Sequence, residues 1–357
     1  MDLTKLPFSM LPVGWFQIGW SAEIGPGDVK PLRYFGKDLV AFRGESGALS
    51  VFDAHCPHLG AHLGHGGKVI GDCIQCPYHG WQWRLADGGN ALIPEQDNTI
   101  NARLRQWHVL EQNDAMFIWH DPTDTPPRWG LPDIFASFDA AMPADGYYPP
   151  FGNSARKWPS EEVHPQIAME NAVDSAHFVY THQAPVSPVL LGYDIGDSVW
   201  TSRVGFRNKH TRQVALELVS KVQGVGTSFT TWTGSYNYRL LFSVTPIDDR
   251  CSDIFYTIWY PRLPGDTGNV MPAHVKDEVE RRFLNTVNED LLIWRTQVYV
   301  PHPIHARADM KTYPALRKWQ KRFYDLPAET PAAVREPDDT CSERPQLGTQ
   351  KAALQLP

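Results

Sequence analysis

Two short stretches in the first third of the chain each place a cysteine beside a histidine. Cys56 and His58 are separated by one residue, and Cys76 and His79 by two residues. Thiolate and imidazole both bind metals, and a set of two cysteines and two histidines could hold one zinc ion. Zinc ligands usually come as a cysteine pair followed by a histidine pair, whereas here each stretch supplies one of each type. The spacing therefore favours another metal centre over zinc.

The same four residues suit a Rieske [2Fe–2S] cluster, in which two thiolates hold one iron and two imidazoles hold the other. Neutral imidazoles remove negative charge, so the potential of such a cluster lies above that of an all-cysteine ferredoxin. The two stretches read C-P-H-L-G and C-P-Y-H-G-W, and in these motifs the chain resembles the Rieske family. The resemblance implies four cluster ligands: Cys56, His58, Cys76 and His79.

Other residues of the same types lie close to these motifs. Cys73 forms a C-x-x-C pair with Cys76, but Cys76 is needed for the cluster, so we expect Cys73 to be a buried thiol. We expect three further histidines to be polar loop residues: His55, His62 and His65. Respiratory Rieske proteins carry a second cysteine pair, and Ala61 and Tyr78 stand at the matching positions here. The resemblance therefore points to the branch that serves oxygenases and their ferredoxins.

A second group of polar residues recurs with helical spacing further along the chain. Glu170, Asp174 and His177 stand at i, i+4 and i+7, which places them on one face of a helix predicted over residues 167–181. A solvated helix face would explain the same pattern. The neighbouring residues are largely apolar, however, and so favour a buried helix. His182 can rejoin His177 only if the helix loosens near its end.

A carboxylate occupies the apolar face of a second predicted helix, over residues 273–300. That face carries apolar residues at helical spacing: Val275, Val279, Phe283, Val287, Trp294 and Val298. Asp290 falls within this face, whereas Glu278 and Glu289 are expected on the solvent side. A buried carboxylate is costly unless it is paired or binds a metal. We therefore predict Asp290 as the third ligand, because two histidines and one carboxylate form the facial triad of non-haem Fe(II) oxygenases.

The segment around His177 resembles the second signature of Rieske oxygenases, E-x3-D-x2-H-x4-H, and the late D-x-x-I-W resembles the ketosteroid 9α-hydroxylase group. The resemblance covers roughly residues 10–320. It implies that His177, His182 and Asp290 hold iron, which agrees with the apolar-face argument. It also implies that Asp174 bridges His177 to a cluster histidine of a neighbouring subunit, in a homotrimer.

The elements that must position these residues indicate two domains and a tail. We expect an all-β Rieske domain at residues 1–125, an α+β catalytic domain at 126–325 with an antiparallel sheet flanked by helices, and a tail at 326–357. Residues 121–129 look like a linker. The expected strands are residues 38–43, 49–53, 107–111 and 115–119 in the first domain and 213–224, 227–233, 236–244 and 253–260 in the second.

Composition excludes several other classes of protein. The net charge is −7 with no basic cluster, so nucleic acid is not expected as a partner. No apolar stretch is long enough to span a membrane, and the N-terminus lacks the pattern of a signal peptide. The five cysteines are unevenly spread, which argues against a disulfide framework. We therefore expect a cytoplasmic protein.

These features predict the terminal oxygenase of a multicomponent Rieske monooxygenase, with O2 as cosubstrate. No dinucleotide-binding glycine motif is present, so electrons from NAD(P)H should arrive through a separate ferredoxin-type reductase. The alternatives from other classes are a Rieske electron carrier and a zinc-stabilised binding protein.

We expect a hydrophobic ring substrate, with a steroid first and a smaller aromatic or terpenoid second. Hydroxylation, dihydroxylation, demethylation and desaturation all use the same ligands. Eight aromatic residues are candidates for substrate contact: Phe229, Trp232, Tyr236, Tyr238, Phe242, Phe255, Tyr256 and Trp259.

Overall fold

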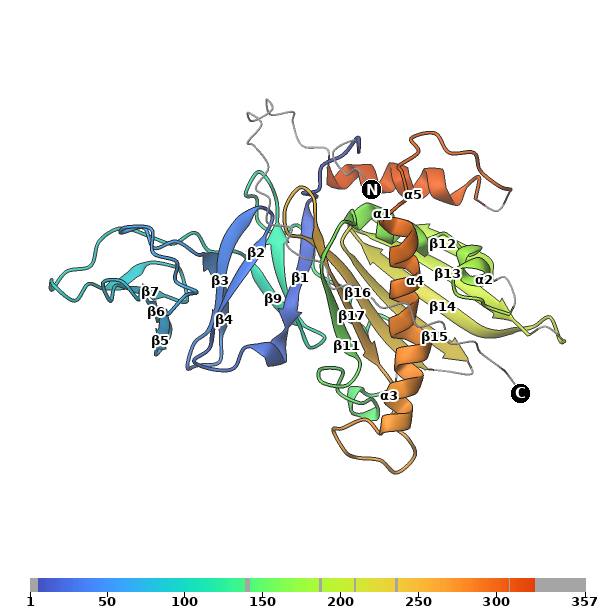
Figure 1. The fold of residues 1–357 in the computed structure, drawn as a ribbon, viewed down its shortest axis with the longest axis horizontal. Helices are drawn as coiled ribbons and strands as arrows, with labels where there is room; N and C mark the ends of the chain where they lie inside the picture. Colours follow the sequence, from blue (N-terminus) through green and yellow to red (C-terminus); the bar gives the residue numbers. More distant parts are fainter. Residues whose placement is uncertain are drawn as a thin grey trace. The chain divides into compact units, whose positions relative to one another are not determined.

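The computed structural model describes residues 6–138, 142–185, 188–208, 210–234, 237–307 and 309–324. Three small antiparallel sheets form the N-terminal part, and one seven-stranded antiparallel sheet with helices forms the C-terminal part (Figure 1). The predicted fold class, an all-β domain followed by an α+β domain, is confirmed. The predicted tail at residues 326–357 lies outside the described residues.

The N-terminal part builds its sheets from short hairpins. The first sheet has the order β1 (Gly14–Trp20), β10 (Ala115–His120), β9 (Val109–Gln112), and the second the order β2 (Val29–Tyr34), β3 (Lys37–Arg43), β4 (Leu49–Asp53). The third sheet follows sequence order: β5 (Lys68–Ile70), β6 (Cys73–Gln75), β7 (Gln82–Arg84) and β8 (Asn90–Leu92). A short 3-10 helix, η2 (Ser21–Glu23), follows β1.

The C-terminal sheet runs in the order β11, β17, β16, β15, β14, β13, β12, and every neighbouring pair is antiparallel. Its strands are β11 (Ala155–Glu161), β12 (Val189–Ile195), β13 (Val199–Arg207), β14 (Val214–Gln223), β15 (Thr227–Gly234), β16 (Tyr238–Pro246) and β17 (Ser252–Trp259). The predicted strands agree with these bounds to within about two residues.

Helices cover one face of this sheet, with α4 in front of the central strands in Figure 1. The α-helices are α1 (Pro165–Met169), α2 (His177–Tyr180), α3 (Ala273–Val279), α4 (Asn285–Trp294) and α5 (Thr312–Gln320). The shorter turns are η3 (Ala144–Gly146), η4 (Glu170–Ala172), the π-helical η5 (Glu280–Leu284) and η6 (Lys321–Phe323). The segments α3, η5 and α4 follow one another without a break.

The single helix predicted over residues 167–181 is wrong, because the structure divides this segment into α1, η4 and α2. The Asp174 carboxylate explains the division. It accepts hydrogen bonds from the backbone N–H groups of Ala176 and His177, both at 3.1 Å. A short polar side chain that bonds nearby N–H groups offers the backbone an alternative to continuous helix. Asp174 therefore restarts the helix at His177 and does not lie within a continuous one.

The second predicted helix is confirmed to Trp294 but not to residue 300. Thr296 donates its hydroxyl to the carbonyls of Leu292 and Ile293, at 3.1 and 3.2 Å, beyond the last helical residue. The apolar face is buried as predicted up to Trp294, whereas Val298 is 70% exposed. The helix therefore ends soon after it has placed Asp290.

The small sheets and the large sheet pack together through polar as well as apolar contacts. Trp20 on β1 donates its indole N–H to the Thr257 hydroxyl at 2.8 Å, and the Tyr34 hydroxyl donates to Asp253 at 2.8 Å.

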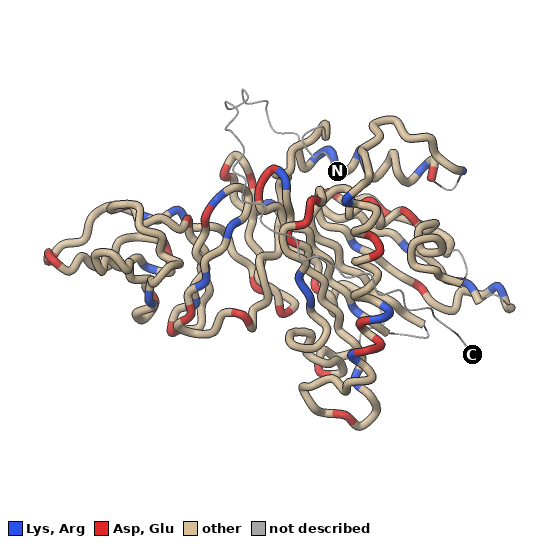
Figure 2. Tube along the Cα trace, viewed as in Figure 1, with Lys and Arg blue, Asp and Glu red and all other residues tan. Residues whose placement is uncertain are grey.

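Basic and acidic residues are interspersed along the trace (Figure 2). None of the helices in the described ranges is long and apolar enough to span a membrane.

Candidate metal centres and substrate cavity

The two cysteine–histidine loops have the same backbone conformation. In each loop the cysteine N–H donates to the carbonyl five residues later, at 2.9 Å from Cys56 and 2.8 Å from Cys76. Gly60 and Gly80 donate back to the carbonyls of these cysteines and have φ of +75° and +71°. Glycine adopts this left-handed conformation without the steric penalty of a side chain. The two loops thus hold their cysteine and histidine residues on the same backbone conformation.

The donor atoms of these loops fit a [2Fe–2S] cluster. Cys56 and Cys76 are 1% and 3% exposed, and burial, with a further contribution from Cys76, raises the pKa of the Cys56 thiol. Two buried thiolates side by side therefore need compensating positive charge, which ferric iron supplies. Nδ1 of His79 is buried and has no hydrogen-bond partner in the described part of the chain, so it is free to bind iron. The His58 ring centroid lies 4.7 Å from that of His79.

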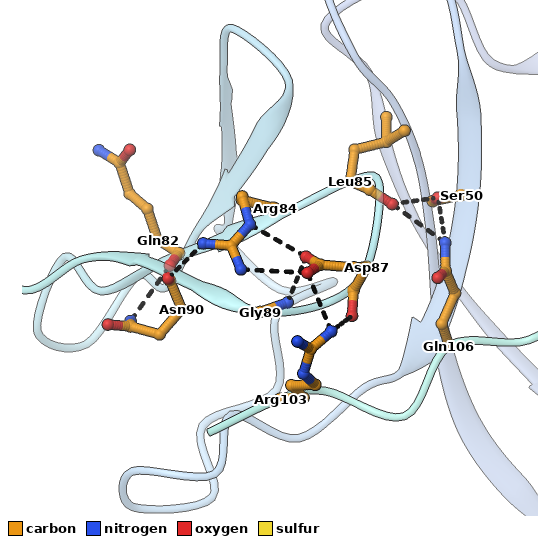
Figure 3. A network of polar contacts seen from close by, with 9 residues as sticks. All are labelled: Ser50, Gln82, Arg84, Leu85, Asp87, Gly89, Asn90, Arg103 and Gln106. Carbon is orange, nitrogen blue, oxygen red and sulfur yellow. Dashed lines mark hydrogen bonds and ion pairs between the residues drawn. The ribbon is translucent and has the colours of Figure 1, made fainter. Parts of the chain in front are cut away.

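Contacts made immediately before and after β7 support the two loops. Trp81 stacks on His58 with ring centroids 4.2 Å apart. Directly after β7, Asp87 accepts hydrogen bonds from Arg84 and Arg103 (Figure 3). The pKa of Asp87 is lowered to about 2, and the largest cause is the hydrogen bond from Arg84. This charged network fixes the turn behind the loop, because β7 continues directly from the loop that carries His79.

One further cysteine and three further histidines lie close to these motifs in the sequence. Cys73 is half-buried in β6, and burial raises the pKa of its thiol. His55 is exposed and its Nδ1 lies 3.0 Å from the Gly60 carbonyl oxygen, so it supports the first loop. His62 and His65 lie beside one another, with ring centroids 4.4 Å apart.

A second possible metal site lies between the helices and the large sheet. One ligand atom from each of His177, His182 and Asp290 lies within 4.8 Å of the other two. His177 opens α2, and His182 follows in the turn after α2 ends at Tyr180. Asp290 comes from α4, more than one hundred residues later in the chain. The structure thus brings together the three residues that the sequence suggested as a triad.

Both histidines are oriented so that Nε2 faces this site. His177 Nδ1 lies 2.6 Å from the Asp174 backbone carbonyl oxygen, which can only accept, so Nδ1 carries the proton. His182 Nδ1 lies 2.8 Å from Glu289 Oε2, and its Nε2 lies 3.4 Å from Asp290 Oδ1. Nε2 of His182 and Oδ1 of Asp290 each offer a lone pair, and a separation of 3.4 Å suits one cation bound between the two atoms. A protein acceptor on the second ring nitrogen is the usual way to orient a metal-binding imidazole.

The electrostatics of Asp290 fit a metal ligand. Burial raises the pKa of Asp290 to about 6, although His182 and His177 act in the opposite direction. An ionised carboxylate is therefore unfavourable here without additional positive charge. A divalent cation would supply that charge, so the residues present fit the mononuclear iron that the facial triad implies.

Asp174 lies beside this site but outside the triad. Burial opposes its ionisation, but hydrogen bonds and charge from His177, together with the Tyr313 hydroxyl, lower the pKa of Asp174 overall. For His177, burial also opposes ionisation, and Asp174 more than offsets it, so the pKa of His177 is raised. The two side chains thus form a coupled pair with part of Asp174 still facing solvent.

Three supporting residues were not anticipated. Glu289 was expected to face solvent, but it orients His182. Tyr313 on α5 contacts Asp174. Arg317 forms a buried two-point ion pair with Glu170, the residue that shares helical spacing with Asp174 and His177, with both N–O distances at 2.8 Å. Each partner lies over one hundred residues away in sequence, so local spacing gave no signal for it.

A cavity of about 660 Å³ opens onto all three triad residues. It lies between the face of β13–β17 and the segments α2, η5 and α4, and most of its lining is apolar. Four of the eight candidate aromatics line it: Trp232, Tyr238, Phe242 and Tyr256. Phe229, Phe255 and Trp259 do not line it, and Tyr236 lies outside the described residues. The cavity has the size and character of a small-molecule site.

Comparison with protein families agrees with this architecture. Residues 14–108 match the Rieske [2Fe-2S] domain, and residues 118–324 match the family described as 3-Ketosteroid 9alpha-hydroxylase C-terminal domain. The chain is therefore an oxidoreductase of the Rieske oxygenase class. Within that class it belongs to the 3-ketosteroid 9α-hydroxylase C-terminal domain family, because the second match spans more than half of its residues.

Relatives cover most of the chain. Cholesterol 7-desaturase nvd of Bombyx mori is 27% identical over 347 residues, which are 90% of this chain and 71% of the relative. The 3-ketosteroid-9-alpha-monooxygenase oxygenase component of Rhodococcus rhodochrous is 27% identical over 341 residues, 89% of this chain and 85% of the relative.

Solved structures show the same fold. Dicamba monooxygenase bound to dicamba has a TM-score of 0.62 at 16% identity, covering 87% of this chain and 96% of that one. NdmA of Pseudomonas putida CBB5 has a TM-score of 0.62 at 17% identity, covering 86% of this chain and 88% of that one.

Replacing His79 with cysteine tests the cluster ligands. We expect the variant to keep a [2Fe–2S] cluster but to shift its EPR signal, after dithionite reduction, towards that of an all-cysteine ferredoxin, because a thiolate adds negative charge. His65→Cys, at an exposed position, serves as the matched control and should leave the spectrum unchanged. A wild-type spectrum for His79→Cys would show that His79 does not bind the cluster.

Proposed function

We propose that this chain is the terminal oxygenase that hydroxylates a fused-ring, steroid-like substrate in the 660 Å³ cavity. The observation that carries the proposal is that one apolar cavity opens onto His177, His182 and Asp290 together. These residues would hold mononuclear Fe(II), and Cys56, His58, Cys76 and His79 would hold the cluster. When bound, the iron supplies O2 activation and the cluster supplies single electrons. The names of the relatives support the steroid class.

The side chains of the chain bind, orient and shield the substrate. Phe178 packs against both triad histidines, with ring centroids 4.4 Å from His177 and 5.8 Å from His182. Phe206 and Trp232 extend this aromatic wall away from the triad. Such a lining excludes water from the reacting carbon and leaves the chemistry to the metal.

Electron delivery requires partners. We propose that a separate NAD(P)H-dependent reductase of the ferredoxin type reduces the cluster, and that the chain works as a homotrimer. Figure 1 shows β6 and β7 far from α2, with the sheets of β1–β4 and β11–β17 between them. The cluster of one chain is thus poorly placed to serve its own triad. Asp174 keeps 28% of its side chain exposed and can meet a cluster histidine of a neighbouring chain.

Desaturation is a second candidate reaction, favoured by the relatives named cholesterol 7-desaturase. The two reactions differ in product mass. Hydroxylation adds one oxygen atom from O2 to the substrate, whereas desaturation removes two hydrogen atoms and adds no oxygen.

Turnover under 18O2 tests the proposed function. With reductase and NADH, we expect a 3-ketosteroid to gain one labelled oxygen atom, read by mass spectrometry. A product without label that has two hydrogen atoms fewer than the substrate would show that the reaction is desaturation. If no steroid stimulated O2 uptake while a small aromatic acid or ether did, the steroid class would be wrong and the oxygenase class would stand.

Asp290→Ala tests the iron ligands. We expect the variant to lose one iron atom per chain and to keep its acid-labile sulfide, because only the cavity site loses a ligand. Asp277→Ala, an exposed carboxylate on α3, is the matched control. Full iron content in purified Asp290→Ala would show that another group is the ligand.

Asp174→Asn tests the route of the electron. The amide keeps an oxygen for the N–H groups of Ala176 and His177, so both metal contents should stay normal. Loss of the charged contact should slow substrate-dependent reoxidation of the reduced cluster by roughly 10–100-fold or more, followed by stopped-flow absorbance. Asp277→Asn should reoxidise at the wild-type rate. A wild-type rate for Asp174→Asn would remove Asp174 from the route.

A further inference from the structure

The sheet face beneath the cavity is built from alternate residues of β14, β15 and β16. Side chains alternate between the two faces of a strand, so residues of even number on these three strands share one face. All of the following even-numbered residues line the cavity: Leu216, Leu218, Ser220 and Val222 on β14, Ser228, Thr230 and Trp232 on β15, and Tyr238, Leu240 and Phe242 on β16. Most of them are apolar or aromatic. Three carry aliphatic hydroxyl groups, and these three are adjacent.

Ser220, Ser228 and Thr230 form one hydroxyl cluster on this face. Ser220 and Thr230 are direct partners across the β14–β15 ladder. The Ser220 hydroxyl lies 2.9 Å from that of Ser228 and 3.1 Å from that of Thr230. The three residues are 4%, 7% and 6% exposed in that order. All three residues line the cavity, so this buried cluster borders the open space beside the triad.

The cluster does not use all of its hydrogen-bonding capacity. Three hydroxyls have three protons to donate and can accept more bonds than they donate. The two shorter contacts use two protons. The third proton has only the contact between Ser228 and Thr230, whose 3.5 Å separation exceeds the usual range for O–H···O bonds. A buried hydroxyl without a full partner is unfavourable, so the cluster favours a polar ligand atom.

The other hydroxyls on this face are already engaged. Tyr256 bonds the Thr286 side chain, and Tyr238 bonds the Tyr260 side chain. The cationic residues of the cavity lining, Arg281 and Arg282, come from η5 in the helical layer and not from the sheet. The hydroxyl cluster is therefore an uncharged polar point on an otherwise apolar floor. It suits a neutral oxygen atom and would not compensate a carboxylate.

We propose that Ser220, Ser228 and Thr230 bind a neutral ring oxygen, a ketone or a hydroxyl, of the fused-ring substrate. This inference rests on the proposed function and adds a specificity-determining site to it. A hydroxyl cluster can donate to a ketone and can accept from an alcohol, so either oxygen fits. The triad approaches the cavity from α2 and α4, on the helical side. Anchoring one oxygen on the sheet side therefore sets which ring carbon faces the triad.

Equilibrium binding to the full-length holoenzyme tests the site without relying on turnover. The probes are 5α-androstane, which has no oxygen, and its monoketones at C3 and at C17. The test variant is Ser220→Ala with Thr230→Val, which removes two hydroxyls and nearly preserves volume. The matched control is Thr231→Val, because Thr231 is 1% exposed and points to the opposite face of β15.

For the wild type, we expect at least one monoketone to bind more tightly than the hydrocarbon. In the double variant the dissociation constant of that monoketone should rise by about tenfold, because a hydrogen bond to a buried group is lost. The dissociation constant of 5α-androstane should stay within about twofold of the wild-type value. Thr231→Val should keep the wild-type preference. An unchanged preference in the double variant, or an equal loss in Thr231→Val, would overturn the site and leave the proposed function standing. If the wild type bound none of the three probes, the steroid class would fail and this site with it.

Discussion

The largely buried carboxylate of Asp290, with 14% of its side chain exposed, is the constraint on which the proposed iron site depends. Burial opposes its ionisation, as the pKa of about 6 shows, and Glu289 beside it adds further negative charge. His182 contacts both acids and ties the turn after α2 to α4. Without a bound cation, His182 and His177 compensate the charge of Asp290 and Glu289 only in part, since the pKa of Asp290 stays raised. The same arrangement becomes favourable once a divalent ion binds, so metal binding and the packing of α4 over the sheet support each other.

The two proposed metal centres are built in different ways, and this difference determines how far each can be predicted from the sequence. Each cluster loop is complete within about six residues, with its own backbone hydrogen bonds and its own left-handed glycine. Sequence spacing therefore predicts it directly. The proposed triad joins segments more than one hundred residues apart. Two sequence features had linked them: the predicted burial of Asp290 on an apolar helix face and the resemblance to Rieske oxygenases. Helical spacing suggested His177, although the helix itself is interrupted at Asp174, whereas His182 fell outside that spacing and was implied by the resemblance.

The supporting contacts show where sequence reasoning stops. Glu289 lies on the side of its helix that a periodic pattern assigns to solvent, yet the turn that carries His182 packs there. Glu170 shares the spacing of Asp174 and His177, but Arg317 on α5 neutralises it. Periodicity gives the face of an element but not what covers that face. Such partners follow from tertiary packing, and so could not be read from local patterns.

Local sequence patterns do not predict substrate specificity either, and the reason is physical. The triad and the cluster loops sit on helices and hairpins, whereas the floor of the cavity consists of alternate residues of β14–β16. A side chain on that floor can change without altering a metal ligand or a ladder hydrogen bond, because the ladder uses backbone atoms. Chains with the same ligands can therefore diverge in specificity. In this chain the floor combines aromatic residues with the hydroxyl group of Thr230 and its two serine neighbours. The sheet face that we propose binds a ring oxygen is thus separate from the residues that we propose hold the metals.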